Sequence, residues 1–340
     1  MKGESSVSEE QKLILDMLSE GKISVEEAQT LLESLGKEET KTDKEAYGQS
    51  ERPSIMDGII DTIRSGLSSV NFAFGDGAKI VLEERHSGRF NTDNVDLELA
   101  VRNGSLRIQT WDEDEFRLDI IKKVMAGTRE QAEELVSGFR FAEIDGSLLR
   151  AGDQECRNLG NRINVSLRLW LPRQHRYSGK LESRNGSIEV TGVDSKGMDI
   201  HTVNGSLKCN KVSGERVEAR TVNGSLSLEG NLGGVKARTT NGSITMTNIA
   251  EDSKCELETV NGRIRVYLPV RSGIGLAVDA RTKSGSVGLE HPSLVTMFSQ
   301  RGMAGGRSVE ARTENWKEAG NKIELHLRSV NGSIRIQELE

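Results

Sequence analysis

Aromatic residues and proline are scarce in this sequence, and this scarcity limits the kind of core that it can build. Aromatic side chains make up 4% of the 340 residues, and 4 prolines stand against 36 glycines. A wide globular core usually carries more aromatic bulk than this. The composition therefore indicates a thin, repetitive core with many tight corners, and the regular recurrence of aliphatic residues argues against a disordered chain.

Cysteine and histidine are also few, and they form no recognisable metal or redox pattern. The three cysteines, Cys156, Cys209 and Cys255, include no C-x-x-C pair and are odd in number, and the five histidines show no H-x-H or H-E-x-x-H spacing. A disulfide framework, a zinc site and other cofactors are therefore not expected. We expect Cys209 and Cys255 to be small buried side chains. Cys156 lies outside the clear repeats and is a candidate exposed thiol.

The sequence has neither an excess of positive charge nor a long apolar run. The 46 Lys and Arg residues against 52 Asp and Glu give a net charge of −6, which argues against a nucleic-acid partner. No stretch approaches the roughly 18 consecutive apolar residues of a membrane-spanning helix. The first residues, MKGESSVSEEQKLIL, lack the apolar core of a secretory signal. We therefore expect a cytoplasmic protein, with peripheral attachment to the membrane or envelope, or surface exposure by a non-classical route, as the alternatives.

Residues 1–36 have the pattern of a small α-helical hairpin. A capping box, in which a serine is followed three residues later by glutamine or glutamate, occurs at Ser8 and again at Ser24. Gly21 can end the first helix in the left-handed conformation. Because a core of fewer than roughly 40 residues is seldom stable alone, we expect the hairpin to dock on a protein partner, on a second copy or on the rest of the chain. Its predicted interaction surface consists of Leu13, Met17, Leu31 and Leu32.

Two segments separate this hairpin from the rest of the chain. Residues 37–53, KEETKTDKEAYGQSERP, are polar without an apolar period, which predicts a flexible linker. Residues 54–78 contain aliphatic residues spaced as in a short amphipathic helix. A helix on a membrane surface would be rich in Lys and Arg, whereas this segment contains Asp57, Asp61 and Arg64. We therefore favour a segment that caps the following domain over one that lies on a membrane.

The remainder of the chain is dominated by an internal repeat around the dipeptide Asn-Gly. The dipeptide begins at residues 103, 185, 204, 223, 241, 261 and 331, and Ser-Gly at 284 stands in an equivalent context. The spacings between 185 and 261 are 19, 19, 18 and 20. Apolar residues recur four positions before each Asn and three and five positions after it. This is the period-2 alternation of half-buried strands on both sides of a fixed corner.

Two further columns of the repeat are polar and uniform. A Thr or Ser stands two residues before each repeat Asn from Asn185 onward, and Ser stands two residues after most of them, with Arg263 as an exception. Copies stacked about 4.8 Å apart can hydrogen-bond through identical side chains. Glycine would supply the positive φ that such corners often need. We therefore predict a structural corner ladder made of Asn185, Asn204, Asn223, Asn241, Asn261 and Asn331.

Two folds are compatible with these corners. Asn-Gly between strands is a strong signal for a β-hairpin with a type I′ turn, so a hairpin-based sheet is the alternative. We favour a stack of rungs because each repeat resembles its neighbours position by position, as stacked near-copies require. The predicted fold is mainly β: a β-helix, or β-solenoid, over residues 79–340 with rungs of about 19 residues, and a helical insertion near 128–139.

The repeat resembles the bacterial putative-adhesin family of β-strand-repeat domains. The similarity covers about residues 80–340 and rests on VDLELAVRNGSLRIQTWDED, on LRLWLPRQHRYSGKLESRNGSIEV and on the tandem TVNGSL units. The leading GKISVEEAQTLLESLG is similar to the SHOCT-like N-terminal domain that accompanies this family in YvlB- and LiaX-type proteins of Gram-positive bacteria. The resemblance implies a right-handed β-helix with a small helical module, associated with cell-envelope stress responses, and some relatives are exported or surface-associated.

No pattern typical of an enzyme accompanies the repeat. The sequence has no G-x-S-x-G elbow and no Walker or dinucleotide glycine pattern. A polysaccharide-degrading β-helix needs clustered carboxylates, whereas these columns contain Thr, Ser and Asn. The column three residues before the Asn is a stripe of mixed charge from Glu182 to Arg328. It could bind an anionic glycan, but we favour a solvated face of stacked opposite charges.

The sequence therefore predicts a non-enzymatic protein. The favoured hypothesis is a scaffold or sensor of a bacterial cell-envelope stress response, which acts through protein–protein interaction by way of its N-terminal hairpin. The alternative is a surface adhesin or glycan-binding β-helix protein, which would bind carbohydrate along the Glu182 to Arg328 stripe.

Overall fold

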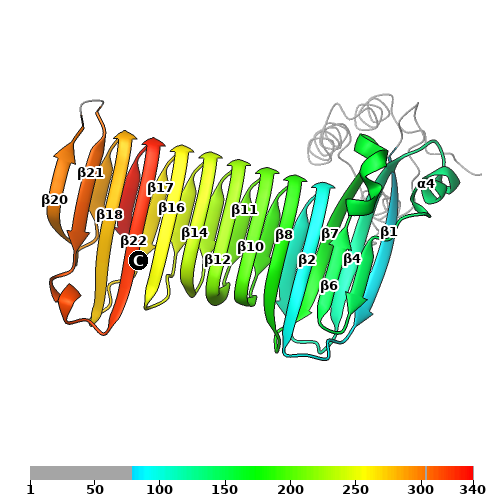
Figure 1. The fold of residues 1–340 in the computed structure, drawn as a ribbon, viewed down its shortest axis with the longest axis horizontal. Coiled ribbons are helices and arrows are strands. Elements are labelled where there is room, and N and C mark those ends of the chain that lie inside the picture. Colours follow the sequence, from blue (N-terminus) through cyan, green and yellow to red (C-terminus); the bar gives the residue numbers. More distant parts are fainter. Residues whose placement is uncertain (1–78, 303–304, 340) are drawn as a thin grey trace, which may run out of the picture. The chain divides into compact units, whose positions relative to one another are not determined.

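The computed structural model of the chain describes residues 79–302 and 305–339. The predicted helical hairpin (1–36), linker (37–53) and capping segment (54–78) lie outside these residues. The described part is mainly β and forms two sheets that face each other, as Figure 1 shows. Its helical elements are α4 (Arg129–Val136) and the 3-10 segments η2 (Gln154–Arg162) and η3 (Glu314–Lys317).

Sheet B is the twelve-stranded sheet and contains the longer strands. In spatial order it consists of β20 (Val295–Arg301), β21 (Arg307–Arg312), β18 (Ile274–Ser284), β22 (Asn321–Asn331), β16 (Ser253–Asn261), β14 (Leu232–Asn241), β12 (Ser213–Asn223), β10 (Asp194–Asn204), β8 (Arg176–Asn185), β2 (Asn94–Asn103), β6 (Leu148–Gly152) and β5 (Ala142–Asp145).

Sheet A is the eleven-stranded sheet, and most of its strands are short. In spatial order it consists of β1 (Lys79–Gly88), β4 (Phe116–Met125), β7 (Ile163–Pro172), β3 (Leu106–Trp111), β9 (Ile188–Thr191), β11 (Leu207–Asn210), β13 (Leu226–Glu229), β15 (Ile244–Thr247), β17 (Ile264–Leu268), β23 (Ile334–Glu338) and β19 (Val287–Glu290).

The repeat unit is a rung that joins the two sheets, so the β-solenoid prediction is confirmed. Each rung has one strand of sheet B, a corner, and the following short strand of sheet A, as β10 and β11 illustrate. Neighbouring rungs pair in parallel, and their corner asparagines are aligned, as in Asn204 opposite Asn223. The alternative of successive hairpins is wrong, because Asn-Gly joins strands of different sheets and no turn pairs β10 with β11.

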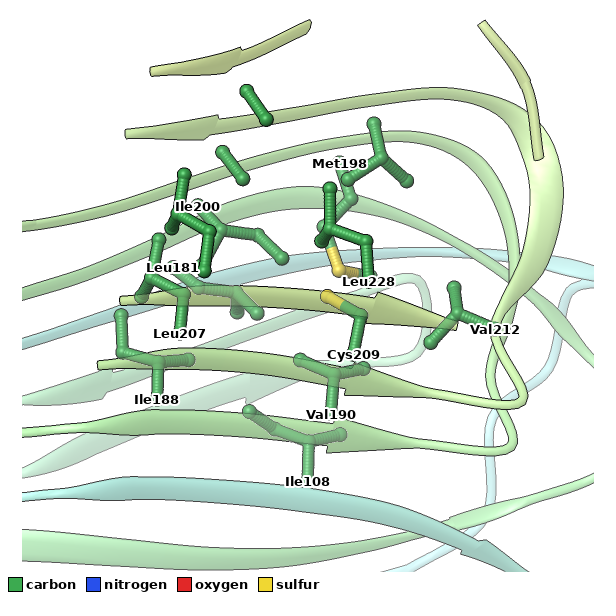
Figure 2. Close-up of a cluster of buried hydrophobic side chains, with 14 of the residues drawn as sticks. Ile108, Leu181, Ile188, Val190, Met198, Ile200, Leu207, Cys209, Val212 and Leu228 are labelled. Carbon is green, nitrogen blue, oxygen red and sulfur yellow. The ribbon is translucent and has the colours of Figure 1, made fainter. Parts of the chain in front are cut away.

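Inward-facing aliphatic columns hold the two sheets together. The residues four positions before the repeat Asn, such as Leu181 and Ile200, are buried, as are Ile188 and Leu207 three positions after it. Figure 2 shows these side chains meeting between the sheets. Because each side chain is thin and aliphatic, the sheets approach closely without aromatic bulk, and burial of each such side chain stabilises the fold by about 1.5–3 kcal/mol.

The C-terminal rung is not the last rung of the stack. Its strands β22 and β23 lie between β16–β17 and β18–β19, although both of those rungs precede it in sequence. All of these pairings are parallel. Asn331 is thereby aligned with Asn261 on one side and with Ser284 on the other. The repeat sequence alone implies stacking in chain order, and this inserted rung is the departure from it.

Antiparallel elements occupy both ends of the described stack (Figure 1). Strands β1, β4 and β7 extend sheet A, and the β20–β21 pair extends sheet B beyond β18. Helix α4 lies within the expected insertion between β4 and β5. It begins after Thr128, whose hydroxyl accepts a hydrogen bond from the Gln131 N–H at 3.3 Å, and it buries Ala132 and Val136. These elements cover the ends of the repeat, as terminal units of solenoids generally do.

Candidate functional site

The corner asparagines form one continuous hydrogen-bonded ladder. The side-chain amide nitrogen of each Asn donates to the side-chain oxygen of the Asn on the neighbouring rung, at 2.7 to 2.9 Å. The ladder runs through Asn103, Asn185, Asn204, Asn223, Asn241, Asn261 and Asn331. Each interior Asn therefore uses one donor and one acceptor within the stack.

The hydroxyl column beside the asparagines makes a second ladder. The Thr221 hydroxyl donates to the Gly205 carbonyl at 2.9 Å, and Thr202, Thr239, Thr259 and other members of the column repeat this contact on their own rungs. These hydroxyl residues are almost fully buried. Each satisfies a corner carbonyl that the strand pairing leaves without a donor.

The glycines of the Asn-Gly corners are required by close approach and not by positive φ, which corrects the sequence-based explanation, whereas Gly285 of the Ser-Gly corner has a φ of 140°. Gly186, Gly205, Gly224 and Gly242 are absent from the residues with positive φ. A Cβ placed on Gly224 would lie 1.9 Å from the Gly205 carbonyl oxygen, and the other corners are equally tight. The glycines of successive rungs stack directly on one another, so any side chain would push the rungs apart.

The stripe of mixed charge lies on the outer face of sheet B. Most of its charged side chains form ion pairs with other charged side chains on that face. Glu182 contacts Lys180 at 2.7 Å, and Arg238 contacts Glu258 at 3.0 Å. Arg281 contacts Asp279 at 2.7 Å. Exposed pairs of this kind contribute about 0–1 kcal/mol each. The charges on this face therefore neutralise one another and leave little net charge for a ligand.

All three cysteines are buried, which corrects the expectation of an exposed thiol at Cys156. Cys156 has an exposed fraction of 0%. Burial raises its thiol pKa to about 11, and nearby Asp153 and Glu155 add to the rise. Burial also raises the thiol pKa of Cys209 and of Cys255 to about 12. Since the thiolate is the reactive form, none of the three is suited to be a nucleophile at neutral pH.

Other kinds of chemical site are not found among residues 79–302 and 305–339. No group of three or more His, Cys, Asp or Glu side chains in this part could hold a metal ion. In the same residues, none of the helices has the length and apolar character needed to cross a bilayer. The predicted interaction residues Leu13, Met17, Leu31 and Leu32 lie outside the described part of the chain.

Sequence reasoning missed one cluster of positively charged side chains. Arg263, Arg265 and Arg335 come together on the outer face of sheet A and line a hollow of about 150 Å³ with Ser333. We call this cluster the arginine hollow. The available signal was the replacement of serine by Arg263 in an otherwise uniform column. The clustering itself depends on the inserted C-terminal rung, which brings residues 265 and 335 into register.

Comparisons with known proteins agree with this architecture. The Toastrack DUF4097 model matches residues 176–337, and a SHOCT-like domain model matches residues 9–40. The uncharacterized protein YvlB of Bacillus subtilis is 30% identical over 149 residues, which are 37% of this chain. The aligned stretch spans 40% of the length of YvlB.

Two solved structures from other bacteria also match this chain. A putative cell adhesion protein from Clostridium sporogenes has 14% sequence identity and a TM-score of 0.38, and the match covers 76% of this chain and 100% of that one. A putative adhesin from Bacteroides fragilis has 11% identity and a TM-score of 0.36, and the match covers 77% and 98% of the two chains. Residues 176–337 of the chain are thus similar to the Toastrack DUF4097 family, and residues 9–40 are similar to a SHOCT-like domain.

Proposed function

We propose that this protein is a non-enzymatic scaffold of a bacterial cell-envelope stress response, with the solenoid as a rigid body and the N-terminal hairpin as the interaction module. One observation carries the proposal: the recurring polar side chains of the repeat bond to the next rung. Asn223, for example, donates to Asn204 and accepts from Asn241. The polar side chains of the repeat thus stabilise the stack of rungs. The outer faces of the two sheets stay available for contact with other molecules.

The hairpin is the part of the chain best suited to recognise a protein. The SHOCT-like match covers residues 9–40, which include the apolar positions Leu13, Met17, Leu31 and Leu32. An amphipathic hairpin of this size gains stability when its apolar side docks on another surface. We propose that this surface belongs to a protein partner or to a second copy, and that the chain acts inside the cell, at or near the membrane.

Paired charge substitutions in the hairpin test this function. Leu31→Asp with Leu32→Asp should abolish association of the full chain with its partner, or with itself, in crosslinked cells of the native bacterium under envelope stress. Gln29→Asp with Ser34→Asp adds the same charge outside the apolar stripe and should leave association intact. The melting of the solenoid should not change in either variant. Unchanged association in the Leu31 and Leu32 variant would refute the proposed interface.

A further inference from the structure

The arginine hollow places three cations close together on adjacent rungs. Arg265 of β17 and Arg335 of β23 are direct register partners on neighbouring parallel strands. Arg263 precedes β17 at the corner, and the three side chains line the hollow of about 150 Å³ with Ser333. On the far side of Arg335 the register partner is Gly288, and the Glu290 Oε1 and Arg335 Cγ atoms lie 3.5 and 3.7 Å from where a Cβ on Gly288 would stand. The hollow itself is lined by the side chains of three arginines and one serine.

The same column of sheet A is arranged differently elsewhere. Near its other end, Glu189 lies between two cations and pairs with Arg107 at 3.3 Å and with Lys208 at 3.8 Å. At the arginine hollow, by contrast, like charges stand directly opposite one another, which is unfavourable on adjacent strands. Within residues 79–302 and 305–339, no carboxylate lies within 4.0 Å of the three guanidinium groups.

The nearby carboxylate of Glu290 is engaged by another group. Glu290 lies two residues beyond Gly288 on β19, and its side-chain oxygen accepts a hydrogen bond from the Gln337 amide at 2.8 Å. The Gln337 amide is neutral, so Glu290 keeps its negative charge and offsets part, but not all, of the positive charge of the three arginines. An arrangement that repels itself in the free protein is stabilised when an anion binds between the charges.

The corner beside the hollow supplies a further donor. On other rungs, the peptide N–H two residues after the Asn donates to the serine hydroxyl of the rung before it, as Ser243 does to Ser225 and Arg263 to Ser243, each at 3.3 Å. Arg263 has no hydroxyl, so Ser333 on the next rung has no equivalent acceptor for its peptide N–H. Arg263, which stands where other rungs have serine, thus adds a cation to the hollow. It also lacks the hydroxyl that would accept the hydrogen bond from the Ser333 peptide N–H.

We propose that the arginine hollow binds a phosphate group. Guanidinium groups match phosphate and carboxylate oxygens in paired hydrogen bonds. A carboxylate has two oxygens, whereas a tetrahedral phosphate offers a separate oxygen to each of three arginines. The second negative charge of a phosphate monoester also offsets more of the positive charge. This site lies on the solenoid and is independent of the hairpin function proposed above.

Calorimetric titration of the full chain with inorganic phosphate tests the proposal. We expect saturable binding that weakens at least about tenfold in Arg265→Gln and in Arg335→Gln, because each loses a charge-assisted contact. Arg107→Gln is the matched control: it lies in the same column and face, but its arginine is already paired with Glu189. Phosphate binding in the control should equal that of the native chain.

Stability in chloride buffer separates binding from folding. The melting temperature of Arg265→Gln and Arg335→Gln should equal or exceed that of the native chain, since the substitution relieves repulsion between register partners. The proposal is overturned if native chain shows no saturable phosphate binding, if both hollow variants bind as the native chain does, or if Arg107→Gln loses binding equally. Binding of acetate as tight as that of phosphate would overturn the assignment to phosphate.

Two further titrations identify the source of the phosphate group. Phosphatidylcholine vesicles that contain phosphatidic acid present it as a lipid headgroup, and glycerol 3-phosphate presents it in solution. Arginine-dependent binding to the vesicles, absent with phosphatidylcholine alone, supports the site and identifies a lipid. Arginine-dependent binding of glycerol 3-phosphate without vesicle binding supports the site and identifies a soluble or polymeric phosphate ester.

Discussion

At the scale of single residues, the asparagine and the glycine of each corner stabilise the stack by different means. The asparagine contributes hydrogen bonds between exposed side chains, as between Asn223 and Asn204 at 2.8 Å. The glycine instead allows two backbones to meet, and it is the carbonyl oxygen of the next rung that excludes a side chain. Substitutions at the two positions should therefore differ in size.

The glycine prediction uses the tight contact at Gly224. Gly224→Ala places a methyl group 1.9 Å from the Gly205 carbonyl oxygen, so the rungs must shift, and we expect a loss of at least about 2–3 kcal/mol in unfolding free energy. Gly197→Ala is the control, because a Cβ there meets nothing within 4 Å. Its effect should stay within about 1 kcal/mol. Urea unfolding measures both, and equal losses would contradict the close-approach explanation.

The asparagine prediction compares the middle of the ladder with its end. Asn223→Ala removes two ladder hydrogen bonds, whereas Asn103→Ala removes one. Because each such bond contributes about 0.5–1 kcal/mol, the loss at Asn223 should be roughly twice the loss at Asn103. The unfolding free energies of the two variants measure the ratio. A negligible loss at Asn223 would show that the ladder does not stabilise the stack.

The thiol prediction follows from the raised pKa values. Burial raises the thiol pKa of Cys209 and Cys255 to about 12 and that of Cys156 to about 11, so the thiolate is a minor form at pH 8. Iodoacetamide should leave the folded chain unmodified at this pH and modify all three cysteines in urea. Mass spectrometry of the intact protein reports the count. Rapid modification of Cys156 in the folded chain would contradict its burial.

Period-2 alternation made the buried columns predictable, because each position's side of the strand follows from its distance to the corner. The reason for the glycines was not predictable in the same way. A sequence shows that glycine recurs at residues 205 and 224, but positive φ and close approach require the same residue. The arginine hollow was hidden for a related reason, since its members lie 70 residues apart in sequence, as Arg265 and Arg335 show.

At the scale of strands and rungs, the repeat predicted each corner but not the order of stacking. The rung of Asn331 carries the same columns as its neighbours, so the columns alone do not show which rungs it lies between. The structure places it between the rungs of Asn261 and Ser284. Identical columns specify the register within a pair of rungs, and they leave open which rungs become neighbours.

The inserted rung should be essential for the strands beyond it. Deletion of residues 321–340 removes β22 and β23, which are the parallel partners of β18 and β19. Residues 274–312 would then keep only the antiparallel β18–β21 and β20–β21 pairings, and we expect them to lose protection from hydrogen exchange. Deuterium uptake mapped by mass spectrometry tests this. Native protection of β18 in the shortened chain would contradict the structural importance of the insertion.

At the scale of the whole molecule, the two segments with family matches have separate proposed tasks. The Toastrack residues 176–337 supply a body fixed by its ladders, and the SHOCT-like residues 9–40 supply the proposed contact with a partner. The paired charges of sheet B make a sugar-binding stripe less favourable than a solvated face, as Arg238 and Glu258 illustrate. A scaffold of this kind acts where its partner is.

The location of the chain in living cells therefore tests the scaffold function most directly. Intact cells of the native bacterium, with and without envelope stress, are treated with external protease, and the full-length chain is then detected in the cells. Lysed cells serve as the control that the protease can cleave the chain. The account predicts protection in intact cells and a soluble or membrane-peripheral fraction. Digestion from outside would contradict an intracellular scaffold and favour a surface adhesin.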